Sequence, residues 1–326
     1  MSRATAAGIV ALVAVGGTAV ALAAGGGDPS RSATDRWTPL SDSLVERTEV
    51  AAARVGRSIY AIGGFERQSG LTTNAVERYD IRSDRWSRVR SMPVGVNHSA
   101  AVAYKGKLYV HGGYSARRDL SSATNILLRY DPRRNRWKRL PSSPSPRAAE
   151  AAAVVGRRLF VAGGSNNKGS LRSLEVYDFA RQRWRSGPDF KGPARNHTTG
   201  AGVGRFFYVL AGRDQQNFRD VDRYDTKRRR WARMPRMKTP RGGIASAVVH
   251  GTIVVFGGEN LGPGGTTIAP VERFDPRRRR WTSLPDMRTP RHGLGGAALG
   301  RRVYTLEGGP QPGFHFSRTI EFLDLP

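Results

Sequence analysis

Residues 58–86 read SIYAIGGFERQSGLTTNAVERYDIRSDRW, and this stretch decides the fold because its signals recur along the 326-residue chain. A β-branched and aromatic run ends at the glycine pair Gly63-Gly64, a second extended run ends at Tyr79, and Trp86 follows soon after. The same succession returns about every 50 residues, a period typical of arrays in which each unit buries its apolar face against the next. We therefore expect the chain to be an array of one repeated unit.

Glycine pairs and tryptophans keep this spacing throughout the chain. The tryptophans are Trp37, Trp86, Trp137, Trp184, Trp231 and Trp281. The glycine-pair positions are Gly63-Gly64, Gly112-Gly113, Gly163-Gly164, Ala211-Gly212, Gly257-Gly258 and Gly308-Gly309. The first tryptophan precedes every glycine pair and no tryptophan follows the last pair, so the array is circularly permuted.

Each unit has room for four short strands, bounded by turn signals. A glycine pair lets neighbouring backbones approach closely, while Tyr79 and Trp86 supply large apolar faces that can pack between adjacent sheets. The carboxylate of Asp80 can accept backbone N–H groups in the turn that follows. These residues are therefore expected to be scaffold.

The combination resembles the kelch repeat, for example in SIYAIGG, VERYD, DRW and SMP between Ser58 and Pro93. The resemblance covers residues 36–326. It departs from the motif where Leu128 replaces the usual acid, where Ala211 replaces the first glycine, and where residues 321–324 read EFLD without the tyrosine. Similarity to kelch proteins implies a β-propeller, in which four-stranded blades surround a central channel.

The permutation gives the number of blades. Five repeats are complete, whereas the last lacks its tryptophan strand, and residues 36–40 around Trp37 can supply it. We therefore expect an all-β, six-bladed β-propeller of four-stranded antiparallel blades, in which the N-terminal strand joins the last blade and closes the ring. An open β-solenoid or two β-sandwiches are the alternatives, but neither explains complementary half-repeats at the two ends.

The first residues do not belong to the repeats. Arg3, an uncharged stretch up to Ala24 and small residues at Ala21-Leu22-Ala23 follow one another as in a signal peptide. An uncleaved membrane anchor is the alternative, because the stretch could span a bilayer. We expect an extracytoplasmic protein, secreted or tethered to the outer side of the cytoplasmic membrane. The expected domains are a signal peptide or anchor (1–24), a flexible linker (25–35) and the propeller (36–326).

The chain contains no cysteine. Disulfides, thiolate metal sites and thiol nucleophiles are therefore excluded. Copper radical oxidases built on a kelch-like propeller use a cofactor that resembles a cysteine-tyrosine crosslink, which this chain cannot make. We expect no cofactor.

Basic residues gather in particular turns. The formal net charge is +28. Most of the basic residues are arginines, a bias that is typical of proteins from GC-rich bacterial genomes. In an antiparallel blade, the turns between strands one and two and between strands three and four lie at one end, here called the turn face. The turns between strands three and four contain Arg133, Arg134, Arg228, Arg229, Arg230, Arg277, Arg278, Arg279 and Arg280. This face could bind an anionic membrane or a cell-wall polymer; solvated turns without a partner are the alternative.

The opposite end of the blades, here called the loop face, has a more varied composition. In kelch proteins the ligands engage these loops, so the resemblance implies a ligand site here, and mixed polar side chains suit a glycan or an acidic peptide. Recurrence within the repeat leaves a structural role open for each residue. The candidate ligand-binding residues are Arg47, His98, Arg147, Glu150, Arg195, His197, Arg213, Arg241, Glu259, Arg291 and His292.

Known catalytic and metal motifs are missing from the sequence. The histidines are scattered, with no His-x-x-x-His spacing, so we expect no metal; His98, His197 and His292 can share the rim only through the equivalence of their repeats. No Gly-x-x-x-x-Gly-Lys, Gly-x-Ser-x-Gly or His-Glu-x-x-His occurs. Nucleotide hydrolysis, serine hydrolysis and zinc proteolysis are therefore disfavoured.

These observations favour a non-enzymatic, exported binding module, expected to be a monomer, that recognises a protein or a polar ligand on the loop face. The alternative is a carbohydrate-active enzyme that resembles the periplasmic N-acetylneuraminate epimerases, in which Arg147, Arg195, Arg241 and Arg291 would hold an acidic sugar. Nucleic-acid binding is not expected, because no groove-reading element is present.

Overall fold

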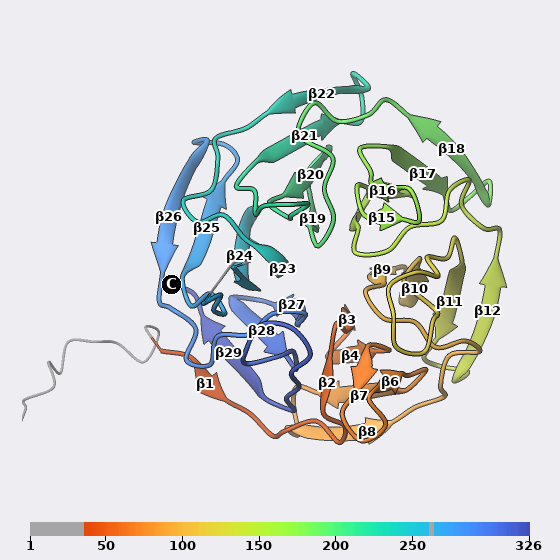
Figure 1. Ribbon diagram of the computed structural model, residues 1–326, viewed down its shortest axis with the longest axis vertical. Helices are drawn as coiled ribbons and strands as arrows, with labels where there is room; N and C mark the ends of the chain where they lie inside the picture. Colours follow the sequence, from red (N-terminus) through yellow and green to blue (C-terminus); the bar gives the residue numbers. More distant parts are fainter. Residues whose placement is uncertain (1–35, 261–263) are drawn as a thin grey trace, which may run out of the picture. The chain divides into compact units, whose positions relative to one another are not determined.

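The computed structural model describes residues 36–260 and 264–326, and every regular element in these two ranges is a β-strand (Figure 1). The predicted signal peptide or anchor (1–24) and linker (25–35) lie outside the described residues. Within the described part of the chain, no helix has the length and apolar character needed to cross a bilayer. The all-β class expected from the sequence is confirmed.

Six four-stranded antiparallel sheets account for most strands in the described ranges. From the innermost strand outwards, sheet 1 is β3 (Ala51–Val55), β4 (Ser58–Ile62), β7 (Val76–Asp80) and β8 (Arg85–Arg88); sheet 2 is β9 (Ala100–Tyr104), β10 (Lys107–His111), β11 (Leu127–Asp131) and β12 (Arg136–Leu140); sheet 3 is β13 (Ala151–Val155), β14 (Arg158–Ala162), β17 (Leu174–Asp178) and β18 (Arg183–Gly187). Sheet 4 is β19 (Thr199–Val203), β20 (Phe206–Leu210), β21 (Val221–Asp225) and β22 (Arg230–Arg233); sheet 5 is β23 (Gly242–Val249), β24 (Thr252–Glu259), β25 (Val271–Asp275) and β26 (Arg280–Leu284); sheet 6 is β27 (Gly295–Leu299), β28 (Arg302–Leu306), β29 (Ile320–Asp324) and β1 (Thr38–Pro39).

Short strands also form in the loops. One small sheet joins β2 (Arg47–Thr48), β5 (Phe65–Glu66) and β6 (Leu71–Thr72), and a hairpin joins β15 (Ser165–Asn166) to β16 (Gly169–Ser170). Both come from connections that lie at the loop face.

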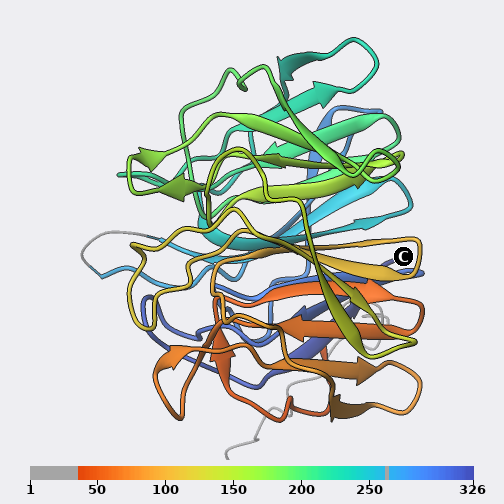
Figure 2. The ribbon, with the colours of Figure 1, turned by 90° about the vertical axis from the view of Figure 1, so that its right-hand side faces the viewer.

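The innermost strands contact one another in sequence order: β3 contacts β9, β9 contacts β13, and the series continues through β19, β23 and β27. Strand β27 in turn contacts β3 (Figure 1). Within each sheet the tight turns lie at one end and the longer loops at the other, as Figure 2 shows from the side. The loop face and the turn face are therefore distinct.

Backbone hydrogen bonds link the residues that lead into the innermost strands. In each bond, an amide N–H that leads into one sheet donates to a carbonyl that leads into a neighbouring sheet. The residue that supplies the carbonyl has a positive φ in every case. The bonds are His98 N to Glu49 O, Ala149 N to His98 O, Thr198 N to Ala149 O, Gly243 N to His197 O, Gly293 N to Gly243 O and Val50 N to Gly293 O. The six acceptor residues therefore lie at the same level of the loop face.

The glycine pairs are required by close packing between sheets. Gly63 has a φ of +61°, and a Cβ there would lie 2.3 Å from the carbonyl oxygen of Val96 in the connection to the next sheet. Gly64 has a φ of +91°, and its Cβ would lie 2.5 Å from Thr48 O. This proximity leaves no room for a side chain at either glycine, and the left-handed φ is a further cost for any other residue.

The tryptophans link neighbouring sheets by packing and hydrogen bonding. In sheets 1 to 5 the tryptophan is the cross-strand partner of Tyr79, Tyr130, Tyr177, Tyr224 or Phe274, with ring centroids 4.9 to 5.2 Å apart. Every indole N–H donates to a backbone carbonyl that follows the outermost strand of the preceding sheet. The acceptors are Ser41 for Trp86, Arg90 for Trp137, Pro141 for Trp184, Pro188 for Trp231, Pro235 for Trp281 and Pro285 for Trp37.

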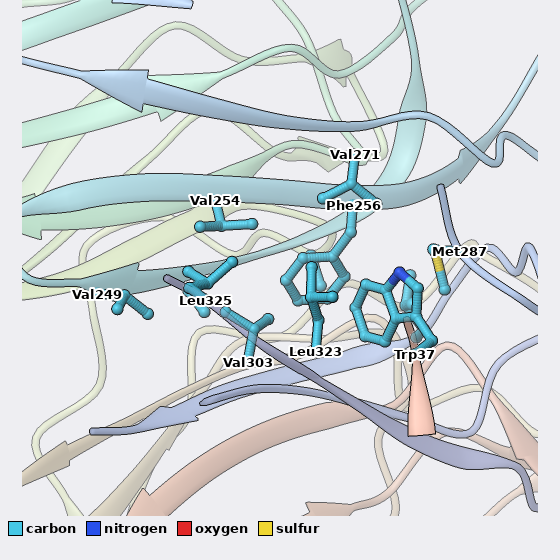
Figure 3. Close-up of a cluster of buried hydrophobic side chains, with 12 residues drawn as sticks. Trp37, Val249, Val254, Phe256, Val271, Met287, Val303, Leu323 and Leu325 are labelled. Carbon is cyan, nitrogen blue, oxygen red and sulfur yellow. The ribbon is translucent and has the colours of Figure 1, made fainter. Parts of the chain in front are cut away.

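The two ends of the repeat array meet in sheet 6. Strand β1 pairs with β29 through Thr38 and Phe322, so an N-terminal strand completes a sheet built from C-terminal strands. Trp37 is 5% exposed and meets Phe256 of sheet 5 edge to face, with ring centroids 6.3 Å apart (Figure 3). Trp37 therefore packs as the other tryptophans do.

Candidate functional site

Five of the predicted ligand-binding arginines lie inside the protein. Arg47, Arg147, Arg195, Arg241 and Arg291 each have 0% exposure. A surface ligand needs an exposed guanidinium, so the structure corrects the prediction that these five side chains contact one. It equally removes Arg147, Arg195, Arg241 and Arg291 as a site for the carboxylate of a sugar.

The buried arginines connect the loop face to the sheets. Arg241 donates to the carbonyl of Gly257, the first residue of a glycine pair, at 3.0 Å and pairs with Glu272 at 2.9 Å. The equivalent ion pairs are Arg47 with Glu77, Arg147 with Glu175, Arg195 with Asp222 and Arg291 with Glu321. A buried guanidinium is tolerated only when such partners compensate its desolvation. The acid that recurs in the third strand of these five sheets therefore has a structural role, which is to compensate the charge of a buried arginine.

Glu150 is also an interior residue. It is 5% exposed, and its Oε1 lies 2.9 Å from Nδ1 of His111, whose Nε2 lies 3.0 Å from Ser143 Oγ. This buried chain of polar groups joins sheets 2 and 3 and satisfies the hydrogen-bonding groups of His111. Glu150 thus has a structural partner in His111, and it also lines the cavity formed by the innermost strands.

The side chains that remain at the loop face converge where the innermost strands begin. Glu49, His98 and His197 occupy equivalent positions in sheets 1, 2 and 4. Glu49 Oε2 lies 3.0 Å from His98 Nε2, and this nitrogen lies 3.1 Å from His197 Nε2. One ligand atom from each of the three residues lies within 4.8 Å of the others. We call these three residues the Glu-His-His cluster.

His292, Arg213 and Glu259 surround this cluster. His292 Nδ1 lies 3.2 Å from Glu49 Oε1 and 3.7 Å from Glu259 Oε2, and Arg213 forms an ion pair with Glu259. Of the eleven ligand-binding residues predicted from the sequence, His98, His197, Arg213, Glu259 and His292 are brought together. They form one connected group of titratable side chains.

The charges in this group depend on one another. Burial raises the pKa of Glu49, but the neighbouring histidines outweigh this effect and hold the pKa well below its usual range. Burial lowers the pKa of His98, although the charge of Glu49 opposes this effect. Burial lowers the pKa of His197 well below its usual range, and the charge of Arg213 adds to this effect. For His292, burial lowers the pKa, but the Glu49 carboxylate, whose Oε1 lies 3.2 Å from Nδ1, raises it overall. The arrangement therefore favours an ionised Glu49 and disfavours a positive charge on His98 and His197.

Aromatic side chains flank the histidines. Phe65 and Tyr114 meet His98 edge to face, with ring centroids 6.2 and 5.6 Å away. Phe65 also contacts Phe314, which is 51% exposed. Below the cluster, the six innermost strands line a cavity of about 430 Å³, which begins at Val50, Ser99 and Thr198, directly after the cluster residues.

All nine arginines predicted for the turn face are exposed. Arg133 and Arg134 lie in the turn between β11 and β12, Arg228 and Arg229 between β21 and β22, and Arg277–Arg279 between β25 and β26. Arg230 and Arg280 begin β22 and β26. Arg229 and Arg279 have positive φ, at turn positions where sheets 1 and 2 have Asp84 and Asn135. The surface required for the anionic-partner prediction is therefore present.

Sequence reasoning left Glu49 out of the predicted site. The repeat contains the signal that finds it, because Glu49 lies two residues after Arg47 as His197 lies two residues after Arg195. Spacing along the chain could not show that sheets 1, 2 and 4 bring their side chains within bonding distance.

Family profiles identify the repeats independently. A profile described as the KLHDC2/KLHL20/DRC7 Kelch-repeats domain matches residues 49–258, and the Kelch motif matches residues 240–288. In a comparison of folds, the solved structure of YjhT matches with a TM-score of 0.74 at 14% identity, covering 86% of this chain and 95% of that chain. This likeness concerns the fold alone.

Several curated relatives share part of the chain. Kelch-like protein 25 of Xenopus tropicalis is 31% identical over 137 residues, which are 40% of this chain and 23% of the relative. Kelch-like protein terF of Aspergillus terreus is 33% identical over 140 residues, 40% of this chain and 30% of the relative. Alpha-scruin of Limulus polyphemus is 29% identical over 147 residues, 44% of this chain and 16% of the relative. The chain thus matches less than a third of the length of each of these relatives. Because the first profile spans more than half of the chain, this chain belongs to the kelch-repeat family.

Proposed function

We propose that residues 36–326 form a closed, six-bladed propeller that serves as a non-enzymatic binding module, with its ligand site on the loop face. Closure is supported by the contact of β27 with β3, by the pairing of β1 with β29 and by the hydrogen bonds of Trp37 and Trp86 to neighbouring sheets. A binding role is supported by the kelch relatives.

The observation that carries the ligand site is the connected group of Glu49, His98, His197, His292, Glu259 and Arg213, which breaks the repeat. Scaffold positions repeat from sheet to sheet, whereas these side chains differ between sheets. Exposed Phe314 adds an apolar contact beside them. Convergent polar groups next to aromatic rings suit a polar ligand, a glycan or a peptide segment of a partner protein.

The test compares the two faces with one panel of ligands. The full chain is titrated with neutral and acidic oligosaccharides and with acidic peptides, and binding is followed by calorimetry. At least one ligand should bind, and Arg213→Ala should weaken it at least tenfold, whereas Arg134→Ala on the turn face should have no effect. Equal affinity in all three proteins would contradict a site on the loop face.

Sugar-directed catalysis is the second candidate, favoured by Arg213, whose side chain is 14% exposed beside His292 and Glu259. This guanidinium would take the place of the four buried arginines as the partner of an acidic sugar. Anomer exchange of α-sialic acid, followed by NMR with the full chain, distinguishes enzyme from binding module. A rate equal to that in buffer would dismiss the epimerase.

We further propose that the protein is extracytoplasmic and that the nine turn-face arginines dock it on an anionic surface. Each basic residue near an anionic membrane contributes about 1 kcal/mol, so a few contacts suffice. Vesicles with and without phosphatidylglycerol test this proposal by sedimentation. Binding should require the anionic lipid and should fall when Arg228–Arg230 and Arg277–Arg280 are changed to glutamate; binding that ignores this reversal would refute the docking.

A further inference from the structure

The Glu-His-His cluster consists of three Lewis bases that face one another. Oε2 of Glu49, Nε2 of His98 and Nε2 of His197 approach within 3.0 and 3.1 Å along the two contacts at His98. Three lone pairs brought this close repel one another unless a cation lies between them. We propose that the cluster is a binding site for a divalent transition-metal ion, with these three atoms as its protein ligands.

The distances fit such an ion. Metal–nitrogen and metal–oxygen bonds to Zn²⁺ are about 2.0–2.1 Å long, so two ligands of a tetrahedral ion are about 3.3 Å apart. The two distances at His98 Nε2, 3.0 and 3.1 Å, need only a small outward movement to reach this value. The third pair of ligand atoms, from Glu49 and His197, lies within 4.8 Å and must adjust to the same value. Two imidazoles and one carboxylate form a ligand set that suits zinc and ferrous iron, and three protein ligands leave a position for water or for a bound ligand.

The hydrogen bonds of the histidines leave the correct nitrogens available. Asn97 donates from Nδ2 to the carbonyl of Tyr114 and to Thr72 Oγ1, so its Oδ1 faces His98 Nδ1, 2.6 Å away, as an acceptor. The proton of His98 is therefore assigned to Nδ1, and Nε2 presents a lone pair. Asn196 holds Nδ1 of His197 in the same way and donates to Ser170.

These outer contacts match the usual surroundings of a metal site. Histidine ligands generally donate their second ring N–H to an oxygen acceptor, which fixes the tautomer and the orientation of the ring. Asn97 and Asn196 supply that acceptor here. His292 lies 3.2 Å from Oε1 of Glu49, so the other carboxylate oxygen is directed at the histidine pair. The two histidine side chains are nearly buried, at 8% exposure each.

A shared proton is the competing occupant, because one imidazolium could bridge Nε2 to Nε2. Titration of the full chain with Zn²⁺ after treatment with a chelator, followed by calorimetry, and with Co²⁺, followed by its visible absorption, separates the two. One equivalent of metal should bind, with cobalt bands that indicate nitrogen and oxygen ligands in low coordination number. Absence of binding, or more than one weak equivalent without these bands, would leave the proton as the occupant and overturn the proposal.

The variants use residues that can adopt the backbone conformation of the cluster residues, so that the protein should still fold. Glu49, His98 and His197 have φ values of 55°, 52° and 48°, and asparagine tolerates this left-handed region better than most residues. His98→Asn and His197→Asn should therefore fold, as far-ultraviolet circular dichroism can check, and each should weaken Zn²⁺ binding at least 100-fold. Glu49→Gln, which keeps the shape but removes the charge, should weaken it at least tenfold.

The matched control is His250→Asn, because His250 also has a positive φ of 47° but lies exposed in the turn after β23. This variant should bind Zn²⁺ as the parent does. Equal loss in His250→Asn and His98→Asn, or no loss in either cluster variant, would overturn the proposal. If His98→Asn does not fold, the Zn²⁺ affinity of Glu49→Gln tests the proposal by itself, because glutamine has the shape of glutamate and leaves the backbone unchanged.

Discussion

Val96 and Leu128 occupy in sheet 2 the positions at which the other five sheets place a buried arginine and its carboxylate partner. Both are buried, at 0% and 1% exposure, in one hydrophobic cluster. In sheet 2 two apolar side chains therefore replace both members of the ion pair. Leu128 stands in place of the acid of the kelch motif, and Val96 stands in place of the arginine. This relationship identifies the repeated arginine and acid as partners in the scaffold.

Replacing one member of such an ion pair by an apolar residue should therefore destabilise the protein, whereas replacing both members should destabilise it far less. Arg241→Val leaves Glu272 buried without its partner and should lower the free energy of unfolding by about 3–5 kcal/mol. Arg241→Val combined with Glu272→Leu reproduces sheet 2 and should recover most of this loss. Urea unfolding of the three proteins measures both effects. A double variant less stable than Arg241→Val would contradict the pairing.

Two sheets carry a side chain at the first position of the glycine pair, Ala211 in sheet 4 and Glu307 in sheet 6, where the structure places the pair at Glu307-Gly308 and not at Gly308-Gly309. Ala211 should tolerate replacement by glycine. Ala211 has a φ of 47°, a left-handed conformation that costs a non-glycine residue about 1–2 kcal/mol. Ala211→Gly should therefore raise stability by about 0.5–1 kcal/mol, measured by thermal unfolding. Gly63→Ala is the opposite control, because its Cβ would meet Val96 O at 2.3 Å, and it should destabilise clearly. Destabilisation by Ala211→Gly would show that the methyl group contributes more than the backbone strain costs.

Stability should depend on pH through Arg47, which shares one positive charge between Glu77 and Glu307, each 2.9 Å away. Burial raises the pKa of Glu77 from 4.5 to about 7, against the opposing effect of Arg47. A raised pKa means that the folded state holds its proton more tightly. The contribution of Glu77 to stability is therefore complete below about pH 4.5 and is lost as the pH rises through about 7.

Thermal unfolding between pH 5 and pH 8 measures this dependence. Glu77→Gln should flatten the decline of the midpoint across that range, because the amide stays neutral and leaves Arg47 paired with Glu307. Glu175→Gln removes the carboxylate beside Arg147 and should instead destabilise at both pH values. A decline of the same steepness in Glu77→Gln and the parent would contradict the assignment.

Trp37 should contribute as much stability as the tryptophans within the repeats, because it fastens β1 to sheets 5 and 6. Trp37→Ala removes a side chain that is 5% exposed and should cost about 3–5 kcal/mol. Leu44→Ala, at a side chain that is 48% exposed, is the control and should change stability by less than about 0.5 kcal/mol. A loss at Trp37 as small as that at Leu44 would show that the N-terminal strand does not hold the sheets together.

The sequence predicted the scaffold better than the site, and the reason is physical. Tyr79, Trp86 and the glycine pairs are short-range signals whose spacing shows the strands and turns directly, and the exposed arginines of the turns follow from that pattern. Arg47 and Arg241 could not be distinguished from surface arginines, because their burial depends on acids about 30 residues away. The approach of His98 to His197 depends on how sheets 2 and 4 are placed relative to each other, and no local pattern encodes that distance.

The most direct test of the site is a crystal of the full chain grown with Zn²⁺, with diffraction recorded on both sides of the zinc absorption edge. The account predicts one strong anomalous peak about 2.0–2.2 Å from Nε2 of His98, Nε2 of His197 and Oε2 of Glu49. Peaks found only at exposed histidines such as His250, or no peak at all with the two Nε2 atoms still in contact, would contradict it.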